Sequence, residues 1–170
     1  NGADSTFGSD NNDITFADGG ATDISIDLGA GANLNINTEV GGTGAGNIAV
    51  NAAIKRIAAG DGDDALDVTI SSGSGTISVE AINTGINDVA LTGATITLND
   101  DITTAADSDD TGASGTTGAV TITGAALIGA DTKVDTSSSN GTITFSSTLN
   151  GADNLDLLSG TAKVDIVGDI

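Results

Sequence analysis

The chain has 170 residues and a formal net charge of −20, because 24 Asp and Glu residues face only four Lys and Arg residues. It contains no Cys, His, Trp, Tyr, Met or Pro. This excludes Ser/His and Cys/His nucleophilic pairs, His/Cys zinc sites, haem and iron–sulfur ligation, and disulfide bonds. Any chemistry must use Asp, Ser, Thr, Asn or the backbone.

The composition predicts a folded all-β chain. Hydrophobic residues make up 38% and charged residues 16% of the sequence, and Ile, Val, Leu and Phe together number 40. Such a chain can bury one core, so we expect residues 1–170 to form a single repeat-built domain, as a segment of a longer protein. The 25 glycines and the excess of Ile and Val over aromatic residues are typical of short strands separated by turns.

Apolar residues alternate with polar ones along most of the chain, which predicts short β-strands. Clusters of Gly, Asp, Asn, Ser and Thr between them predict turns and loops. In chain order, the expected strands centre on residues 14–16, 24–28, 34–36, 48–50, 66–70, 77–79, 89–91, 96–98, 120–122, 143–145, 155–157 and 164–166.

The sequence supports two predictions for residues 48–60. Val50, Ile54, Ile57 and Ala58 have helical spacing, and Gly60 stands where a helix would end. The alternation of Ile48 and Val50 favours irregular strand instead. A short helix therefore remains the alternative over residues 50–58.

A short pattern recurs along the chain: Gly, any residue, Ile or Val, any residue, and a second β-forming apolar residue. The copies are GNIAVNAAI at 46, GTISVEAI at 75, GAVTITGAAL at 118 and GTITFSSTL at 141. Units this short cannot bury an apolar face alone and must stack. We therefore expect a parallel β-helix (β-solenoid) of roughly seven or eight coils, at about 20 to 25 residues per coil. An antiparallel β-sandwich is the alternative.

The stretch GTITFSSTLNGADNLDLLSGTAKVDIVGDI at 141–170 resembles the β-strand repeats of large secreted bacterial surface proteins of the filamentous-haemagglutinin and autotransporter type. DVALTGATITLNDDITT at 88–104 is similar to the same repeats. The resemblance implies a right-handed parallel β-helix that serves as the non-catalytic stalk of an extracellular adhesin. The resemblance implies no functional residue in this sequence, since these repeats have a common fold but no common functional site.

The acidic loops suggest one cofactor, Ca²⁺. The segment AGDGDDALD at 59–67 resembles one nonapeptide of the calcium-binding RTX repeats, and its candidate ligands are Asp61, Asp63, Asp64 and Asp67. Glycine turns direct carboxylates and carbonyls at a hard cation. Tandem copies are missing, so an ordinary turn is the alternative. Further candidate carboxylates for Ca²⁺ in the acidic loops are Asp100, Asp101, Asp107, Asp109 and Asp110. No cofactor is required for the expected structural role.

The charge balance also bears on partners. A strongly acidic chain with four cations is not expected to bind nucleic acid, and no segment has the length or apolarity for membrane insertion. We expect no enzyme activity, since the chain lacks the aromatic and basic residues of a polysaccharide cleft. The expected partners are neighbouring repeats of the same protein, copies of itself, and a host-cell or matrix surface.

Two functions remain open at this point. The first is an extracellular or cell-surface stalk in a bacterial adhesin or surface fibre. The second is a self-assembling surface-layer or filament subunit that Ca²⁺ stabilises. Three Thr-x-Thr triplets, at 95–97, 121–123 and 142–144, would form a flat hydroxyl lattice like that of ice-binding solenoids if they stacked in register. Exposed Thr is also common on ordinary strands.

Overall fold

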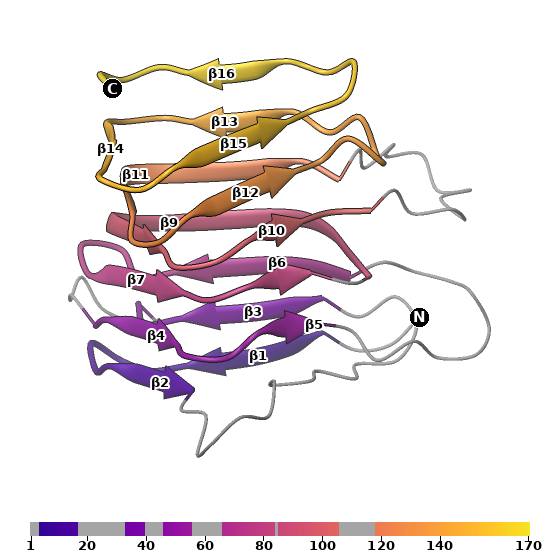
Figure 1. The fold of residues 1–170 in the computed structure, drawn as a ribbon. Coiled ribbons are helices and arrows are strands. Elements are labelled where there is room, and N and C mark those ends of the chain that lie inside the picture. The colour runs from indigo at the N-terminus through magenta and orange to yellow at the C-terminus, as the bar shows by residue number, and fades with distance from the viewer. Residues whose placement is uncertain (1–3, 17–32, 40–45, 56–65, 84, 106–117) are drawn as a thin grey trace.

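The computed structural model describes residues 4–16, 33–39, 46–55, 66–83, 85–105 and 118–170 (Figure 1). These ranges contain strands β1 to β16 and no helix. Every pairing between the strands is parallel, and the one antiparallel contact is an isolated bridge between Asp10 and Glu39. The prediction of an all-β fold is confirmed. Parallel pairing is the pairing expected of a β-solenoid, and it is not that of an antiparallel sandwich.

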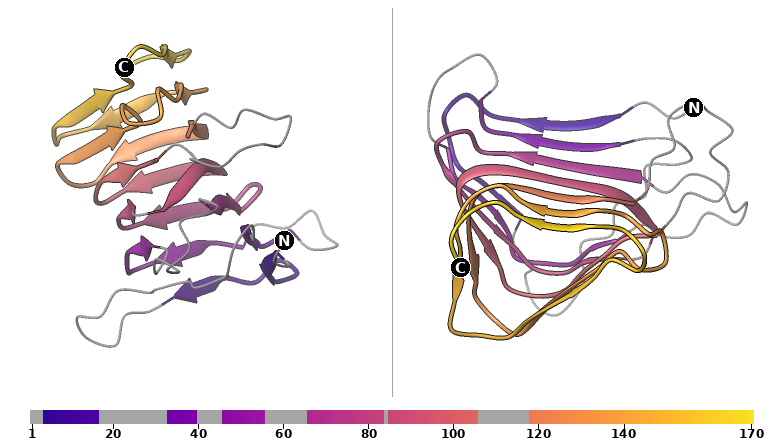
Figure 2. Two further views of the ribbon diagram at one scale, coloured as in Figure 1. Left: turned by 90° about the vertical axis from the view of Figure 1, so that its right-hand side faces the viewer. Right: turned by 90° about the horizontal axis from the view of Figure 1, so that it is seen from above.

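The strands lie above one another along three sides, as the view from above shows (Figure 2). Sides one and two belong to one 11-stranded sheet, and side three is a separate 5-stranded sheet. Side one contains, in order, β1 (Ser5–Gly8), β3 (Leu34–Asn37), β6 (Leu66–Ser71), the first half of β9 (Ile86–Leu98), the first half of β11 (Val120–Ile128), β13 (Ile143–Phe145) and β16 (Val164–Ile166).

Sides two and three contain the remaining strands of the described ranges. Side two contains β2 (Ile14–Phe16), β4 (Ile48–Val50), β7 (Thr76–Val79), the second halves of β9 and β11, and β14 (Leu149–Gly151). Side three contains β5 (Ile54–Lys55), β8 (Ile82–Asn83), β10 (Ile102–Thr103), β12 (Thr132–Asp135) and β15 (Leu155–Leu158).

The register between successive strands of one side places similar residues opposite one another, in rows that run from level to level. On side one, one buried row reads Leu34, Val68, Val89, Val120 and Ile143, and a second reads Ile36, Ile70, Leu91, Ile122 and Phe145. On side two, one row reads Ile48, Ile77, Ile96, Ala126 and Leu149. Since successive residues of a strand point to opposite faces, this alternation sends the aliphatic side chains into one continuous core.

β9 and β11 each run from side one to side two without a break, and glycine makes this bend possible. At Gly124 the register between β11 and β9 shifts, and the backbone φ is 138°. A Cβ atom there would run into the carbonyl oxygen of Gly93 on the strand below. Gly124 therefore permits both the φ value and the close approach of the two strands.

Most predicted strands are observed, namely those at 14–16, 34–36, 48–50, 66–70, 77–79, 89–91, 96–98, 120–122, 143–145, 155–157 and 164–166. The one at 24–28 lies outside the described residues. The alternative helix is not formed where the chain is described, since Val50 belongs to β4 and Ile54 to β5. Its remaining residues, 56–58, and Gly60 lie outside the described ranges.

The recurring glycine pattern corresponds to stacked strands. The copies at 46 and 75 pair through β4 and β7 on side two, with Ile48 opposite Ile77. The copies at 118 and 141 pair through β11 and β13 on side one, with Val120 opposite Ile143. The same short pattern thus serves two different sides of the stack.

Candidate functional site

Carboxylate and amide side chains bind the levels of the stack together where the chain enters side one. Asn33 N–H donates to Asp4 Oδ1, Asp67 N–H to Asn33 Oδ1, and Asp88 N–H to Asp67 Oδ1, each at 3.1 Å. Ala119 N–H donates to Asp88 Oδ1 at 2.6 Å. Each side-chain oxygen replaces the backbone carbonyl that a strand would offer to the level above. We call this chain of four bonds the side-one ladder.

Similar bonds occur where the chain enters the other sides. Asn47 N–H donates to Asp13 Oδ1 at 2.7 Å, and Thr76 N–H donates to Asn47 Oδ1 at 3.0 Å. On side three, Lys133 N–H donates to Asp101 Oδ1 at 2.7 Å, and Asn154 N–H donates to Asp131 Oδ1 at 3.0 Å. Many of the Asp residues expected to lie in solvated loops therefore accept structural hydrogen bonds.

Buried hydroxyl groups close several of the corners. Thr38 Oγ1 donates to the Gly46 carbonyl at 2.9 Å, and Thr104 Oγ1 to the Gly118 carbonyl at 2.5 Å. Thr136 Oγ1 donates to the Gly141 carbonyl at 2.5 Å. These three acceptors are the glycines that open three of the four repeat copies, so the pattern combines a corner acceptor with the strand that follows it. Each Thr is fully buried.

Replacing Thr104 with Val should therefore destabilise the protein. The substitution keeps the shape of the side chain, but it leaves the buried Gly118 carbonyl without the hydroxyl bond, at an expected cost of about 1–3 kcal/mol. Thr103→Val, one residue earlier on the outer face of β10, is the matched control and should change stability by less than about 0.5 kcal/mol. Urea unfolding of both variants measures the difference, and equal losses would refute a structural role for the corner hydroxyl.

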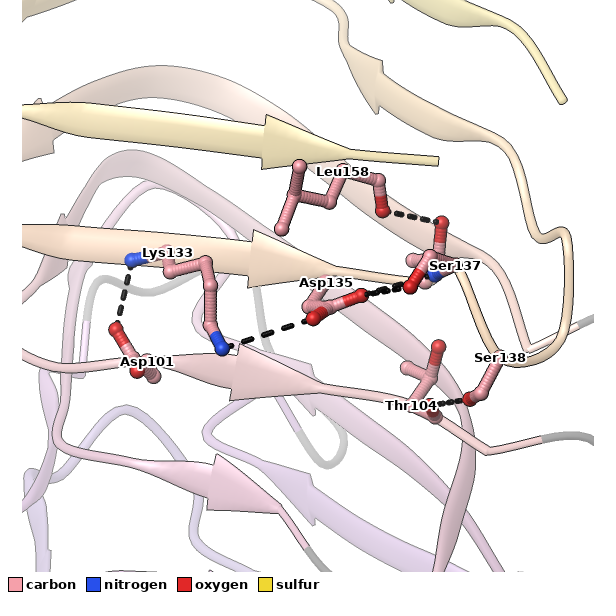
Figure 3. Close-up of polar contacts among 8 residues, drawn as sticks. Asp101, Thr104, Lys133, Asp135, Ser137, Ser138 and Leu158 are labelled. Carbon is pink, nitrogen blue, oxygen red and sulfur yellow. Dashed lines mark hydrogen bonds and ion pairs between the residues drawn. The ribbon is translucent and has the colours of Figure 1, made fainter. Parts of the chain in front are cut away.

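A polar groove of about 360 Å³ lies along side three, lined by Asp101, Asp131, Thr132, Lys133, Asn154 and Asp156. At its edge Lys133 Nζ lies 3.6 Å from Asp135 Oδ2 (Figure 3). Asp135 Oδ1 accepts hydrogen bonds from Ser137 N–H at 3.0 Å and from Ser137 Oγ at 2.6 Å. The Ser137 bonds are the main cause that lowers the pKa of Asp135, and Lys133 adds to them.

The lowered pKa of Asp135 gives a pH prediction. Because the folded state favours the ionised carboxylate, it contributes stability above the ordinary value of 3.8, which is lost as pH falls through the folded-state pKa. Asp135→Asn should therefore be less stable than wild type at pH 7, with the gap narrowing below pH 3.8. Asp156→Asn, on the exposed face of β15, is the control. Denaturant unfolding at several pH values measures both, and a gap independent of pH would contradict the assignment.

A β-bulge brings two carboxylates together on side one. The register between β6 and β9 shifts after Leu66, so Asn87 and Asp88 of β9 lie opposite Asp67 of β6. Asn87 Nδ2 and Asp88 N–H both donate to Asp67 Oδ1 at 3.1 Å. Burial is the main cause that raises the pKa of Asp88, and the charge of Asp67 raises it further, against the lowering effect of the Ala119 and Gly118 N–H groups.

The predicted calcium residues are only partly described. Asp61, Asp63 and Asp64 lie outside the described residues, as do Asp107, Asp109 and Asp110. Asp67 lies in β6 and belongs to the side-one ladder, and Asp101 belongs to the ladder of side three. Asp100 Oδ1 accepts a bond from Asp101 N–H at 2.7 Å. Within the described ranges, no group of three or more His, Cys, Asp or Glu residues is placed to hold a metal ion.

The three Thr-x-Thr triplets do not share one side. Thr121 and Thr123 lie on side one, where they pair with Thr144 and Thr92 respectively. Thr95 and Thr97 lie on side two, where Thr97 pairs with Ser78 and Leu127. A lattice built from all three triplets is therefore not formed.

The carboxy-terminal end of the stack exposes its core rows. An apolar cavity of about 330 Å³ is lined there by residues that include Ile128, Leu149, Leu155, Leu157, Ile166 and Ile170. Leu149 N–H donates to the Asp169 carbonyl at 2.9 Å, so the last residues already begin another level on side two. Ile170 is 86% exposed. This end presents strand edges and apolar rows with the chemistry that a further level would need.

The opposite end is partly covered by aromatic residues. The rings of Phe7 and Phe16 meet edge to face with centroids 5.4 Å apart. Phe7 remains 44% exposed. Among the described residues, no helix is long and apolar enough to cross a membrane.

Comparison with protein-family models, curated proteins and solved structures finds no match to this chain. The similarity to adhesin repeats therefore stays a prediction.

Proposed function

We propose that the three sides form the faces of one parallel β-helix of roughly seven or eight coils. The chain visits side one, side two and side three in turn, and the same order recurs from β3 through β15. Within the described ranges, side one has seven strand segments, which supports the lower of the two counts. The rows of Ile, Val and Leu supply the packing that holds successive coils together.

The proposed function is that of a structural, non-catalytic stalk segment in an extracellular bacterial adhesin or surface fibre protein. The observation that supports it is the continuous pairing of like residues from level to level, reinforced by side-chain ladders on all three sides. Such a stack resists bending and keeps a fixed length per level, at roughly 4.8 Å per strand. In this proposal the partners are neighbouring repeats of the same protein and a host-cell or matrix surface.

A self-assembling filament or surface-layer subunit is the second candidate, and the carboxy-terminal end favours it. Unpaired strand edges and exposed apolar rows there offer an interface to a second copy. The high negative charge opposes that contact, so a filament of this kind would depend on salt or Ca²⁺.

Light scattering and X-ray scattering of the purified chain, with and without millimolar Ca²⁺, distinguish these functions. A stalk segment should stay monomeric in both conditions. A subunit should give ordered assemblies, which Ile166→Glu at the exposed end should abolish while Thr144→Glu on the outer face of side one should not. An expanded scattering profile, as an unfolded chain gives, would contradict both candidates.

A further inference from the structure

The bulge at Asn87 and Asp88 contains a buried polar atom that the fold leaves unsatisfied. Asn87 is 2% exposed, and its Oδ1 accepts no hydrogen bond in the described chain. Burying an unpaired acceptor is costly, so such an atom in a native protein requires an explanation. Asn87 Nδ2 donates to Asp67 Oδ1, so the amide group that carries this oxygen lies next to the Asp67 carboxylate.

The surroundings of this oxygen are electronegative. Asp67 and Asp88 are joined by the Asp88 N–H bond to Asp67 Oδ1, and the charge of Asp67 acts unfavourably on Asp88. Lys133 lies beside Asp135 and Lys163 bonds Asp165, and among the described residues Asp67 is the only charged group that acts on Asp88. Two neighbouring carboxylates and an unpaired amide oxygen thus meet at one partly buried position without a described basic residue to balance them.

We propose that this position binds a divalent cation, Ca²⁺, through the carboxylates of Asp67 and Asp88 and Oδ1 of Asn87. All three donors are oxygens, which Ca²⁺ prefers, and the irregular geometry of a bulge suits Ca²⁺ better than the strict octahedron of Mg²⁺. The cation would give the unpaired Asn87 Oδ1 a partner and would offset the repulsion between the two carboxylates. Since Asp88 also accepts from Ala119, the ion would connect β6, β9 and the start of β11.

Calcium titration by calorimetry, with paired variants, tests this site independently of the stalk function. Asp88→Asn and Asn87→Leu should each weaken one class of Ca²⁺ binding by at least about tenfold. Asp13→Asn is the matched control, because Asp13 accepts a backbone bond from the next level as Asp88 does, loses the same charge, and is not among the residues expected to bind Ca²⁺. It should leave that binding class intact.

A second measurement uses no variant, so its result does not depend on how well the variants fold. In the wild-type chain, the side-chain amide resonance of Asn87 should shift on addition of Ca²⁺ and much less with equal Mg²⁺. The proposal is overturned if Ca²⁺ does not bind saturably at millimolar concentration, if Asp88→Asn and Asp13→Asn weaken binding equally, or if the Asn87 resonance does not respond.

Discussion

Replacing Phe145 with Ala is expected to lower the free energy of unfolding by about 3–5 kcal/mol. Phe145 is 1% exposed and occupies the side-one row between Ile122 and Ile166. Its ring is the largest fully buried side chain of the core. Removing it leaves a cavity that the paired strands on either side cannot fill, because their backbones are fixed by ladder hydrogen bonds. Urea unfolding followed by circular dichroism measures the loss.

Phe7→Ala is the matched control for this substitution, since it deletes the same atoms at the end of the same row. Phe7 is 44% exposed and contacts Phe16 edge to face. The expected loss is about 0.5–1.5 kcal/mol, from the aromatic contact and the partial burial. Equal losses at the two positions would show that the centre of the stack is no better packed than its end.

Gly124→Ala is expected to cost about 2–4 kcal/mol. The residue has a φ of 138°, which an L side chain rarely adopts, and the added Cβ would meet the backbone carbonyl of Gly93. Backbone on both strands must move to relieve the contact. The expected result is a lower midpoint of urea unfolding with an unchanged dependence on urea concentration.

Gly129→Ala, just after the same strand, provides the comparison. Its added Cβ would meet side-chain atoms, Asn99 Oδ1 and Thr97 Cγ2, which can shift more easily than the backbone, and no positive φ is involved. A loss below about 1 kcal/mol is expected there. If Gly129→Ala is as destabilising as Gly124→Ala, the special geometry of the bend does not explain the glycine at 124.

Most strands of sides one and two were predictable because they direct two apolar residues inward at alternate positions. Ile14 with Phe16 and Ile143 with Phe145 show this pattern. β1 and β14 each have one large apolar residue, Phe7 or Leu149, and were not predicted. Side three gave little signal: β5, β8 and β10 have only two residues each, with a single inward Ile at 54, 82 or 102. One apolar residue has no period, so no local pattern distinguishes such a strand from a turn.

The polar features of the stack were less predictable than the core. Asp67, Asp88 and Asp101 look like solvated loop residues in sequence, since Asp favours turns. Their bonds reach residues 21, 31 and 32 positions further along the chain. Such distant partners follow only from the register of the strands, which the sequence pattern does not set. The bulge that gathers Asp67, Asn87 and Asp88 depends on the same register.

The hydroxyl-to-carbonyl bond at the corners has a consequence for how the chain tolerates insertions. Between side three and side one, this bond joins residues 3 apart at Ser159, 5 apart at Thr136 and 14 apart at Thr104. The strands on either side therefore meet in the same way whatever number of residues intervenes. Foreign peptides grafted between Thr136 and Gly141 should accordingly be displayed at the surface without changing the strands they interrupt.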